Sequence, residues 1–324
     1  MKRLTVRIAM VTLALWIGGT GPAGAQAYPT KPVRMVAPSS AGGPVDVICR
    51  AVMQGMEKTL GQSIVIENRA GAAGLIGTDF VAKAPADGYT LLFGFSGPLA
   101  IVPNLNPNTP YDPTTDLVSI TQVATAPYVL LVHPSVPAKN VKQLVALARA
   151  RPGKMNFSSG GNGTGIHMAG ELFNLAANVR ILHVPYKGAA PAITALMAGE
   201  VDLMFNGLPG AITHIKSGKV RALAVGGETR SPLMPDTPTI AESGLDFKTG
   251  GWYGLLAPKG TPRAIVDKVN DALARAVNTP EMKARLTQLA VEPATSTPEA
   301  FAKLIAYEKG LWAKVIQKAG IKMK

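Results

Sequence analysis

The chain has 324 residues, of which 47% are hydrophobic and 16% charged, with a formal net charge of +13 and one cysteine. This composition is typical of a globular protein with room for two hydrophobic cores, and it excludes an intrinsically disordered chain. A lone cysteine cannot form an internal disulfide, so the fold must depend on its cores. Lys and Arg are scattered along the chain, which argues against nucleic acid as a partner and favours a generally basic surface.

The first 27 residues have the pattern of a secretory signal peptide. The basic start MKRLTVR precedes the apolar run IAMVTLALWIGG and the small residues AGAQA. The apolar run is too short to span a membrane comfortably, so we expect cleavage after Ala25 or Ala27. Loss of Lys2, Arg3 and Arg7, with no acidic residue, would change the formal charge from +13 to +10.

The first part of the mature chain alternates between strand and helix patterns. Short apolar runs bounded by turn residues predict strands, and apolar residues at helical spacing predict helices. Strands are expected at 33–38, 62–70 and 87–98, and helices at 45–60 and 71–84. This rhythm predicts a parallel sheet covered on both faces. A connection rich in Pro and Asn follows at 102–116.

After an apolar strand at 128–135, the alternation restarts and predicts a second α/β unit. Strands are expected at 154–159, 181–186, 201–207 and 220–227, and helices at 141–151, 166–177, 188–199 and 210–218. A further strand is expected at 251–260, and the rest of the chain reads as three helices without a strand. Thr279-Pro280 and Thr297-Pro298 are helix starts, each with a Glu just inside the helix. We expect this helical tail to pack on the first unit.

In an open parallel sheet the ligand lies beyond the carboxyl ends of the strands. The loops expected there are rich in Gly, Ser, Thr and Asn, and they precede helix N-termini, whose free N–H groups favour an anion. A purely structural interpretation, in which they are short turns with helix caps, remains open for any single loop. The candidate ligand-binding residues are Ser39, Ser40, Ala41, Gly42, Gly43, Ser96, Gly97, Ser158, Ser159, Gly161, Asn162, Gly163, Thr164, His167, Lys187 and Asn206.

Catalytic motifs are missing from the sequence. GGNGTGIH lacks the third glycine of a dinucleotide-binding loop, and neither a Walker A lysine, G-x-S-x-G nor H-E-x-x-H occurs. His133, His167, His183 and His214 show no metal-ligand spacing, so we expect no metal, no cofactor and no catalytic residue. His167 could reach the pocket, although a packed helix histidine is the commoner role. We interpret Cys49 as a core residue.

A series of motifs runs through almost the whole mature length. It includes YPTKPVRMVAP, GGPVD, GQSIVIENRAGAAGLIG, APADGYTLL, TPYDP, HPSVPAKNVKQL, SSGGNGTGIHMAGELF, HVPYKGAAPAITALMAGEVDLMF, GKVRALAV, PDTPTIAESG and WYGLLAPKGTP. In this order the motifs resemble the Bug-type solute-binding receptors of tripartite tricarboxylate transporters.

The resemblance implies a two-lobed type II periplasmic-binding-protein fold of the α/β class, with mainly parallel sheets joined by two hinge strands. Lobe 1 would comprise 28–127 and 256–324, and lobe 2 would comprise 128–255. It further implies a periplasmic monomer that captures a small carboxylate between the lobes and delivers it to membrane transporter subunits. Ser39–Gly43 and Ser158–Thr164 would hold one carboxylate, partly through water, while Asp46 would cap the first-loop helix.

Two departures from the family pattern bear on the ligand. Pro38-Ser39 stands where relatives often have Pro-Phe, and Phe205-Asn206-Gly207 stands where they often have Phe-Asp-Asn. A neutral Asn206 offers no partner for an ammonium group, and Lys187 could meet a second negative group. We therefore expect a di- or aromatic carboxylate without an amino group. A ligand sensor for a membrane signalling protein and an exported hydrolase are the alternatives.

Overall fold

The computed structural model describes residues 28–39, 41–42, 44–186 and 188–321, and the predicted signal peptide lies outside the described residues. From Lys31 onward the chain forms one compact unit. The strands are β1 Val33–Ala37, β2 Ile64–Asn68, β3 Thr90–Phe95, β4 Leu117–Val132, β5 Asn156–Ser159, β6 Leu182–Pro185, β7 Leu203–Gly207, β8 Arg221–Val225, β9 Gly250–Pro258 and β10 Glu292–Pro293. The α-helices are α2 Pro44–Leu60, α3 Leu75–Ala82, α4 Val102–Leu105, α5 Val141–Ala150, α6 Gly165–Ala177, α7 Ala189–Ala198, α8 Leu208–Lys216, α9 Arg263–Val277, α10 Pro280–Gln288 and α11 Pro298–Ala319.

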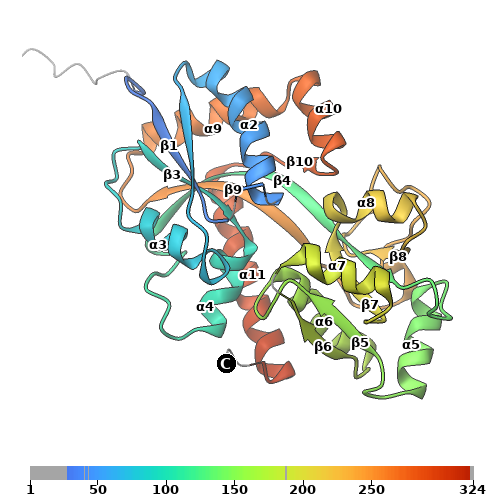
Figure 1. Ribbon diagram of the computed structural model, residues 1–324. Coiled ribbons are helices and arrows are strands. Elements are labelled where there is room, and N and C mark those ends of the chain that lie inside the picture. Colours follow the sequence, from blue (N-terminus) through green and yellow to red (C-terminus); the bar gives the residue numbers. More distant parts are fainter. Residues whose placement is uncertain (1–27, 40, 43, 187, 322–324) are drawn as a thin grey trace, which may run out of the picture. The chain divides into compact units, whose positions relative to one another are not determined.

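The strands form one mixed sheet in the order β2-β1-β3-β9-β4-β7-β5-β6, with β8 and β10 also paired to β4 (Figure 1). Strands β1, β2 and β3 are parallel to one another, as are β5, β6 and β7. The antiparallel strands β9 and β4 lie between these two parallel groups. The predicted α/β architecture is therefore confirmed.

Strand β4 takes part in both groups. Residues Leu117–Pro127 pair with β9, whereas Tyr128–Val132 pair with β7, and β8 pairs with the same stretch from Val129. The sequence predicted only the second stretch. The first stretch contains the sequence SITQVATAP, whose polar residues interrupt the apolar pattern expected of a strand. Its strand conformation is defined by pairing with residues far away in the chain.

Helices cover both faces of the β1-β2-β3 group. Val36 and Leu92 pack with Val81 of α3 and with Phe301 and Ile305 of α11 on one face. On the other face α2 packs against α9, and the Thr59 hydroxyl donates to a carbonyl of α9 at 2.7 Å. This layering explains why β1 and β3 are almost continuously apolar.

The β5-β6-β7 group has the same layered construction. In β4, Leu130 and Val132 pack toward α5 and α6, whereas Val129 and Leu131 pack toward α7 and α8. A cluster of aromatic residues fills the α6 side, where Phe205 stacks on Phe247 with ring centroids 5.5 Å apart. Each side chain of the run VLLV therefore enters a core.

The helical tail contacts more of the molecule than expected. Helices α9 and α10 pack on α2, but α11 contacts both β4 and α6. Trp312, Val315 and Ile316 of α11 share a buried cluster with Leu105 and with Met168 of α6. The two-residue strand β10 also interrupts the tail and pairs with β4. The predicted helix starts are confirmed, because the Thr279 and Thr297 hydroxyls accept bonds from backbone N–H groups of α10 and α11.

Candidate functional site

The loops that follow β5 and β6 lie against each other at the carboxyl ends of these parallel strands. A Cβ on Gly160 would come within 3.1 Å of the Ala189 nitrogen at the start of α7. A Cβ on Gly161 would come within 3.3 Å of the Tyr186 carbonyl oxygen. The glycines predicted to permit close backbone approach are therefore needed for packing between these two loops.

Helix α6 begins at this meeting point and is capped by Thr164. The Thr164 hydroxyl accepts a bond from the His167 N–H at 3.3 Å and donates to the Gly161 carbonyl at 2.8 Å. Among the described residues, nothing accepts a bond from the N–H groups of Gly165 and Ile166. These two groups and the helix dipole make the start of α6 suited to an anion.

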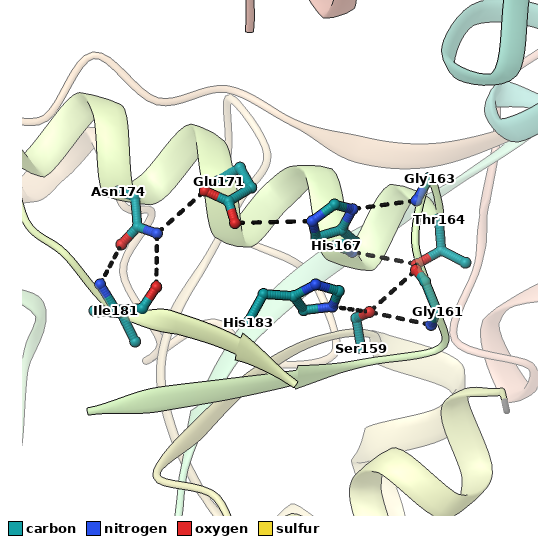
Figure 2. A network of polar contacts seen from close by, with 9 residues as sticks. All are labelled: Ser159, Gly161, Gly163, Thr164, His167, Glu171, Asn174, Ile181 and His183. Carbon is teal, nitrogen blue, oxygen red and sulfur yellow. Dashed lines mark hydrogen bonds and ion pairs between the residues drawn. The ribbon is translucent and has the colours of Figure 1, made fainter. Parts of the chain in front are cut away.

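A buried polar network fixes the shape of the Ser158–Thr164 loop (Figure 2). The Ser159 hydroxyl lies 2.6 Å from His183 Nε2 and accepts a bond from the Gly161 N–H at 3.1 Å. On the other side of the loop, the Gly163 N–H donates to His167 Nδ1 at 3.1 Å. Two predicted ligand residues, Ser159 and His167, therefore make bonds within the protein that position the loop.

Both histidines in this network are uncharged at neutral pH. Burial lowers the pKa of His167 to about 4. Burial, and then repulsion from a charged His167, lower the pKa of His183 to about 3. Because His167 Nδ1 accepts a bond, its proton is on Nε2, which lies 3.7 Å from a Glu171 carboxylate oxygen. His167 therefore acts as a neutral bridge between the loop and the second turn of α6.

Asp46 lies in the first turn of α2, just after the loop that follows β1, and its carboxylate is fully engaged. It accepts bonds from the Gly42 N–H at 2.8 Å, from Arg50 at 3.0 Å and from the Asn68 amide at 2.9 Å. Burial acts to raise the pKa of Asp46, but bonds from Arg50, Gly42 and Asn68 hold it below its usual value. The expected capping role takes a different form, since Asp46 bonds the N–H of a loop residue that precedes its helix.

The remaining predicted residues of this loop lie close to Asp46. The Asn68 amide donates to the Ser39 carbonyl at 3.3 Å, while the Ser39 hydroxyl oxygen is buried without a described partner. Ala41 and Gly42 are exposed. Predictions for Ser40, Gly43 and Lys187 lie outside the described residues.

Ser96 and Gly97 follow β3 and lie beside the loop after β1. A Cβ on Gly74 would come within 3.0 Å of Pro98 and within 3.2 Å of the Pro38 carbonyl oxygen. Ser96 is 5% exposed, and its side chain lies beside the hydroxyl of Tyr128, the first residue of β4 that pairs with β7. Ser96 thus connects the loops of the β1-β2-β3 group to the β5-β6-β7 group.

Asn206 is buried at the end of β7, opposite Val129 of β4, with 4% of its surface exposed. A Cβ on Gly210 of α8 would lie 3.3 Å from the Asn206 amide nitrogen. Within the described part of the chain, no group forms a hydrogen bond with this amide. Asn206 is therefore a buried neutral amide with unused hydrogen-bonding capacity.

Residues 48–321 match the family described as the tripartite tricarboxylate transporter family receptor, TctC. The chain belongs to the TctC family. BugT of Bordetella pertussis is 36% identical, and the match covers 99% of each chain. A TctC-like R. palustris protein solved with adipate is 35% identical, with a TM-score of 0.83 over 91% of this chain and 99% of that one. MatC of Rhodopseudomonas palustris, solved with bound malate, is 34% identical, with a TM-score of 0.78 over 89% of this chain and 100% of that one.

Membership of the TctC family confirms the resemblance inferred from the sequence motifs. TctC receptors are periplasmic solute-binding proteins with two lobes. No helix in the described part of this chain is both long and apolar enough to cross a membrane. The described residues also include no group of three or more His, Cys, Asp or Glu that could hold a metal ion.

Sequence reasoning missed two residues that lie at the start of α6. Tyr128 was read only as the first residue of an apolar strand, yet its hydroxyl lies against the start of α6. His183 was read as an isolated histidine in a strand, yet its ring stacks on His167. A polar aromatic residue at the start of an apolar run was the available signal for Tyr128. No local signal links His183 to a helix that precedes it in the chain.

Proposed function

We propose that this receptor captures a small organic carboxylate without an amino group, with a di- or aromatic carboxylate preferred, in a cleft between two lobes. The observation that carries the proposal is the uncharged donor set at the start of α6. Among the described residues, nothing accepts a bond from the N–H groups of Gly165 and Ile166, and the neighbouring histidines are neutral. Such a site favours a carboxylate through oriented N–H groups and the helix dipole.

The acidic groups support the exclusion of an amino group. A buried ammonium needs a carboxylate or several carbonyls around it. Asp46 already accepts bonds from Gly42, Arg50 and Asn68. Asn206 is neutral, and Glu171 faces His167. The two family members described above were solved with adipate and with malate, both dicarboxylates that lack an amino group.

The proposed lobes are those of the sequence prediction, 28–127 with 256–324 and 128–255. The first boundary is supported by β4, which pairs with β9 up to Pro127 and with β7 from Tyr128 onward. The second boundary falls within β9, which pairs with β4 from Gly250 onward. Strands β4 and β9 would carry the hinge, and the loops after β1, β3 and β5 would close on the ligand.

We further propose that the receptor is non-catalytic, works in the periplasm as a monomer and delivers its ligand to membrane subunits of the tripartite tricarboxylate type. The family assignment and the signal-peptide pattern support this role. The chemistry of the site also agrees, because His167 and Ser159 make bonds that hold the loop in place.

Isothermal titration of the mature protein tests the ligand class. Adipate, malate, succinate and benzoate should be titrated beside aspartate and glutamate. We expect stoichiometric binding of one or more of the first four acids and weaker binding of both amino acids. Tighter binding of either amino acid would overturn the exclusion and would point to Asp46 as the ammonium partner. Chemical change of a bound acid on prolonged incubation would overturn the non-catalytic role.

A further inference from the structure

Tyr128 occupies a special position in β4. It is the first residue of the strand that pairs with β7, where it lies opposite Gly207. Only 9% of its surface is exposed. The Ser96 side chain lies beside its hydroxyl, but no described carbonyl or carboxylate accepts a hydrogen bond from it. A hydroxyl group can donate one hydrogen bond and accept others, so a phenol beside Ser96 retains the capacity to donate to a ligand.

The hydroxyl of Tyr128 is directed at the first residue of α6. A Cβ on Gly165 would lie 2.1 Å from Tyr128 Oη and 3.1 Å from Cζ. Any larger residue would therefore displace the tyrosine. Because Gly165 has no side chain, the hydroxyl lies directly against the backbone of the first turn. The N–H groups of Gly165 and Ile166, which have no acceptor in the described part of the chain, start from the same turn.

The first turn of α6 therefore has three uncharged donors in its neighbourhood: two backbone N–H groups and one phenol. Burial raises the pKa of Tyr128, so the phenol stays protonated at neutral pH and can donate. A carboxylate has two oxygens and about four acceptor positions, enough for all three donors. Hydrogen bonds to an ionised acceptor are about twice as strong as those between neutral groups.

We propose that Tyr128 donates a hydrogen bond to the ligand carboxylate received by the N-terminus of α6, and that Gly165 is required because it leaves room for the hydroxyl. The inference rests on the proposed function, to which it adds a specificity-determining side chain. The phenol supplies a donor that a bare helix N-terminus lacks. The site thereby gains affinity for a carboxylate without a charged residue.

The primary test is Tyr128→Phe, which removes the hydroxyl and retains the ring. Titration of the mature protein with adipate, malate and succinate should show affinity lowered by roughly 10- to 100-fold, the value of one bond to a charged group. The control is Tyr111→Phe. Tyr111 is also buried, but its hydroxyl donates to the Pro98 carbonyl at 2.8 Å, so its loss should lower the melting temperature and leave affinity unchanged.

A second pair of variants tests the geometry without a ligand. Gly165→Ala should lower the melting temperature, because the new methyl group would overlap Tyr128 Oη. Combining it with Tyr128→Phe should bring the melting temperature most of the way back, since the nearest remaining ring atom would be Cζ at 3.1 Å. The double variant should still bind weakly, because the phenol donor is absent.

The outcomes separate this inference from the proposed function. If the wild-type protein binds none of the three acids, the proposed function fails and this inference fails with it. If the wild-type protein binds an acid and Tyr128→Phe binds it equally well, only the inference is overturned. If Gly165→Ala is as stable as the wild type, the close approach between Gly165 and Tyr128 is wrong.

Discussion

The imidazole rings of His167 and His183 stack with centroids 3.9 Å apart and an interplanar angle of 22°. His167 belongs to the first turn of α6, and His183 belongs to the edge strand β6. Phe157 of β5 lies beside the pair, with its ring centroid 5.0 Å from that of His183. The stack therefore ties the start of α6 to the edge of the sheet, and both rings are neutral at pH 7.

This stack predicts that acid destabilises the protein. The pKa values of His167 and His183 in the folded state, about 4 and about 3, lie below the unfolded value of about 6.5. Below pH 6.5 the unfolded chain binds more protons than the folded chain, so the free energy of unfolding falls as the pH drops toward 4. Urea denaturation at intervals between pH 7 and pH 4 measures this loss.

His183→Gln isolates the contribution of the stack. Glutamine can still hydrogen bond with Ser159, but it does not titrate, so the variant should lose less stability between pH 6.5 and pH 4 than the wild type. His214→Gln, on α8, is the control, and its free energy of unfolding should change with pH as in the wild type. If the free energy of unfolding changes equally with pH in the wild type and in His183→Gln, the stack is not the cause of the acid destabilisation.

Glu308 predicts an opposite dependence on pH. Burial raises its pKa to about 7, against the effect of the neighbouring Trp252 and of the Trp312 N–H, which donates to the Glu308 carboxylate at 3.4 Å. The folded state therefore holds this proton more tightly than the unfolded chain, and the contribution of Glu308 to stability falls as the pH rises from about 4.5 to 7. Glu308→Gln, which imitates the protonated acid, should be more stable than the wild type at pH 8 but not at pH 4.5.

Denaturation of Glu308→Gln at pH 4.5 and at pH 8 checks this expectation, with Glu281→Gln as the control at an exposed position on α10. If Glu308→Gln destabilises the protein equally at both pH values, the Glu308 carboxylate is bound as an anion and its pKa is not raised.

Thr164→Ala should reduce both stability and affinity. Loss of the helix cap should cost about 1 kcal/mol of unfolding free energy. The Thr164 hydroxyl also anchors the Gly161 carbonyl at 2.8 Å, so the loop and the unpaired N–H groups of α6 should lose their fixed geometry. We expect carboxylate affinity to weaken by roughly 1.5–3 kcal/mol, because the bonds from these N–H groups to a charged ligand would be weakened.

Thr279→Ala provides a matched cap deletion, since Thr279 caps α10 with the same geometry. It should lose similar stability and keep its affinity. Cys49→Ser, at a fully buried position, should also keep its affinity. If either control weakens titrated binding more than Thr164→Ala does, the site has been placed wrongly.

Ligand binding should close the two proposed lobes. We predict bending in β4 and β9, near Leu130 and Leu255, because donors on both sides of these strands would contribute to the site. Small-angle scattering with and without saturating dicarboxylate should show a smaller radius of gyration in the bound state. An unchanged radius, together with binding demonstrated by titration, would rule out a hinged cleft.

Local patterns predicted most of the elements because each strand and helix has its own apolar signature. Short runs such as VRMVAP are buried on both faces, and the Thr-Pro helix starts carry their caps in the sequence. The first stretch of β4 was missed because Thr121, Gln122 and Thr125 interrupt the apolar pattern. Its strand conformation depends on pairing with β9, more than a hundred residues away.

The site was predictable where glycine and hydroxyl residues gather, as in Ser158–Thr164. The roles within it were less predictable. The position of Tyr128 depends on the register between β4 and β7 and on its approach to Gly165, and neither is encoded locally. The internal bonds of Asp46 and His167 also depend on residues brought together only by the fold.

The position of β9 between β3 and β4 has a consequence for synthesis of the chain. Strands β3 and β4 are not direct neighbours in the sheet, because β9, residues 250–258, lies between them. A nascent chain that has passed β4 still lacks this central strand for more than a hundred residues of translation. The gap favours slow, late formation of long-range pairs. Completion of the sheet is thereby deferred until most of the polypeptide has been synthesised.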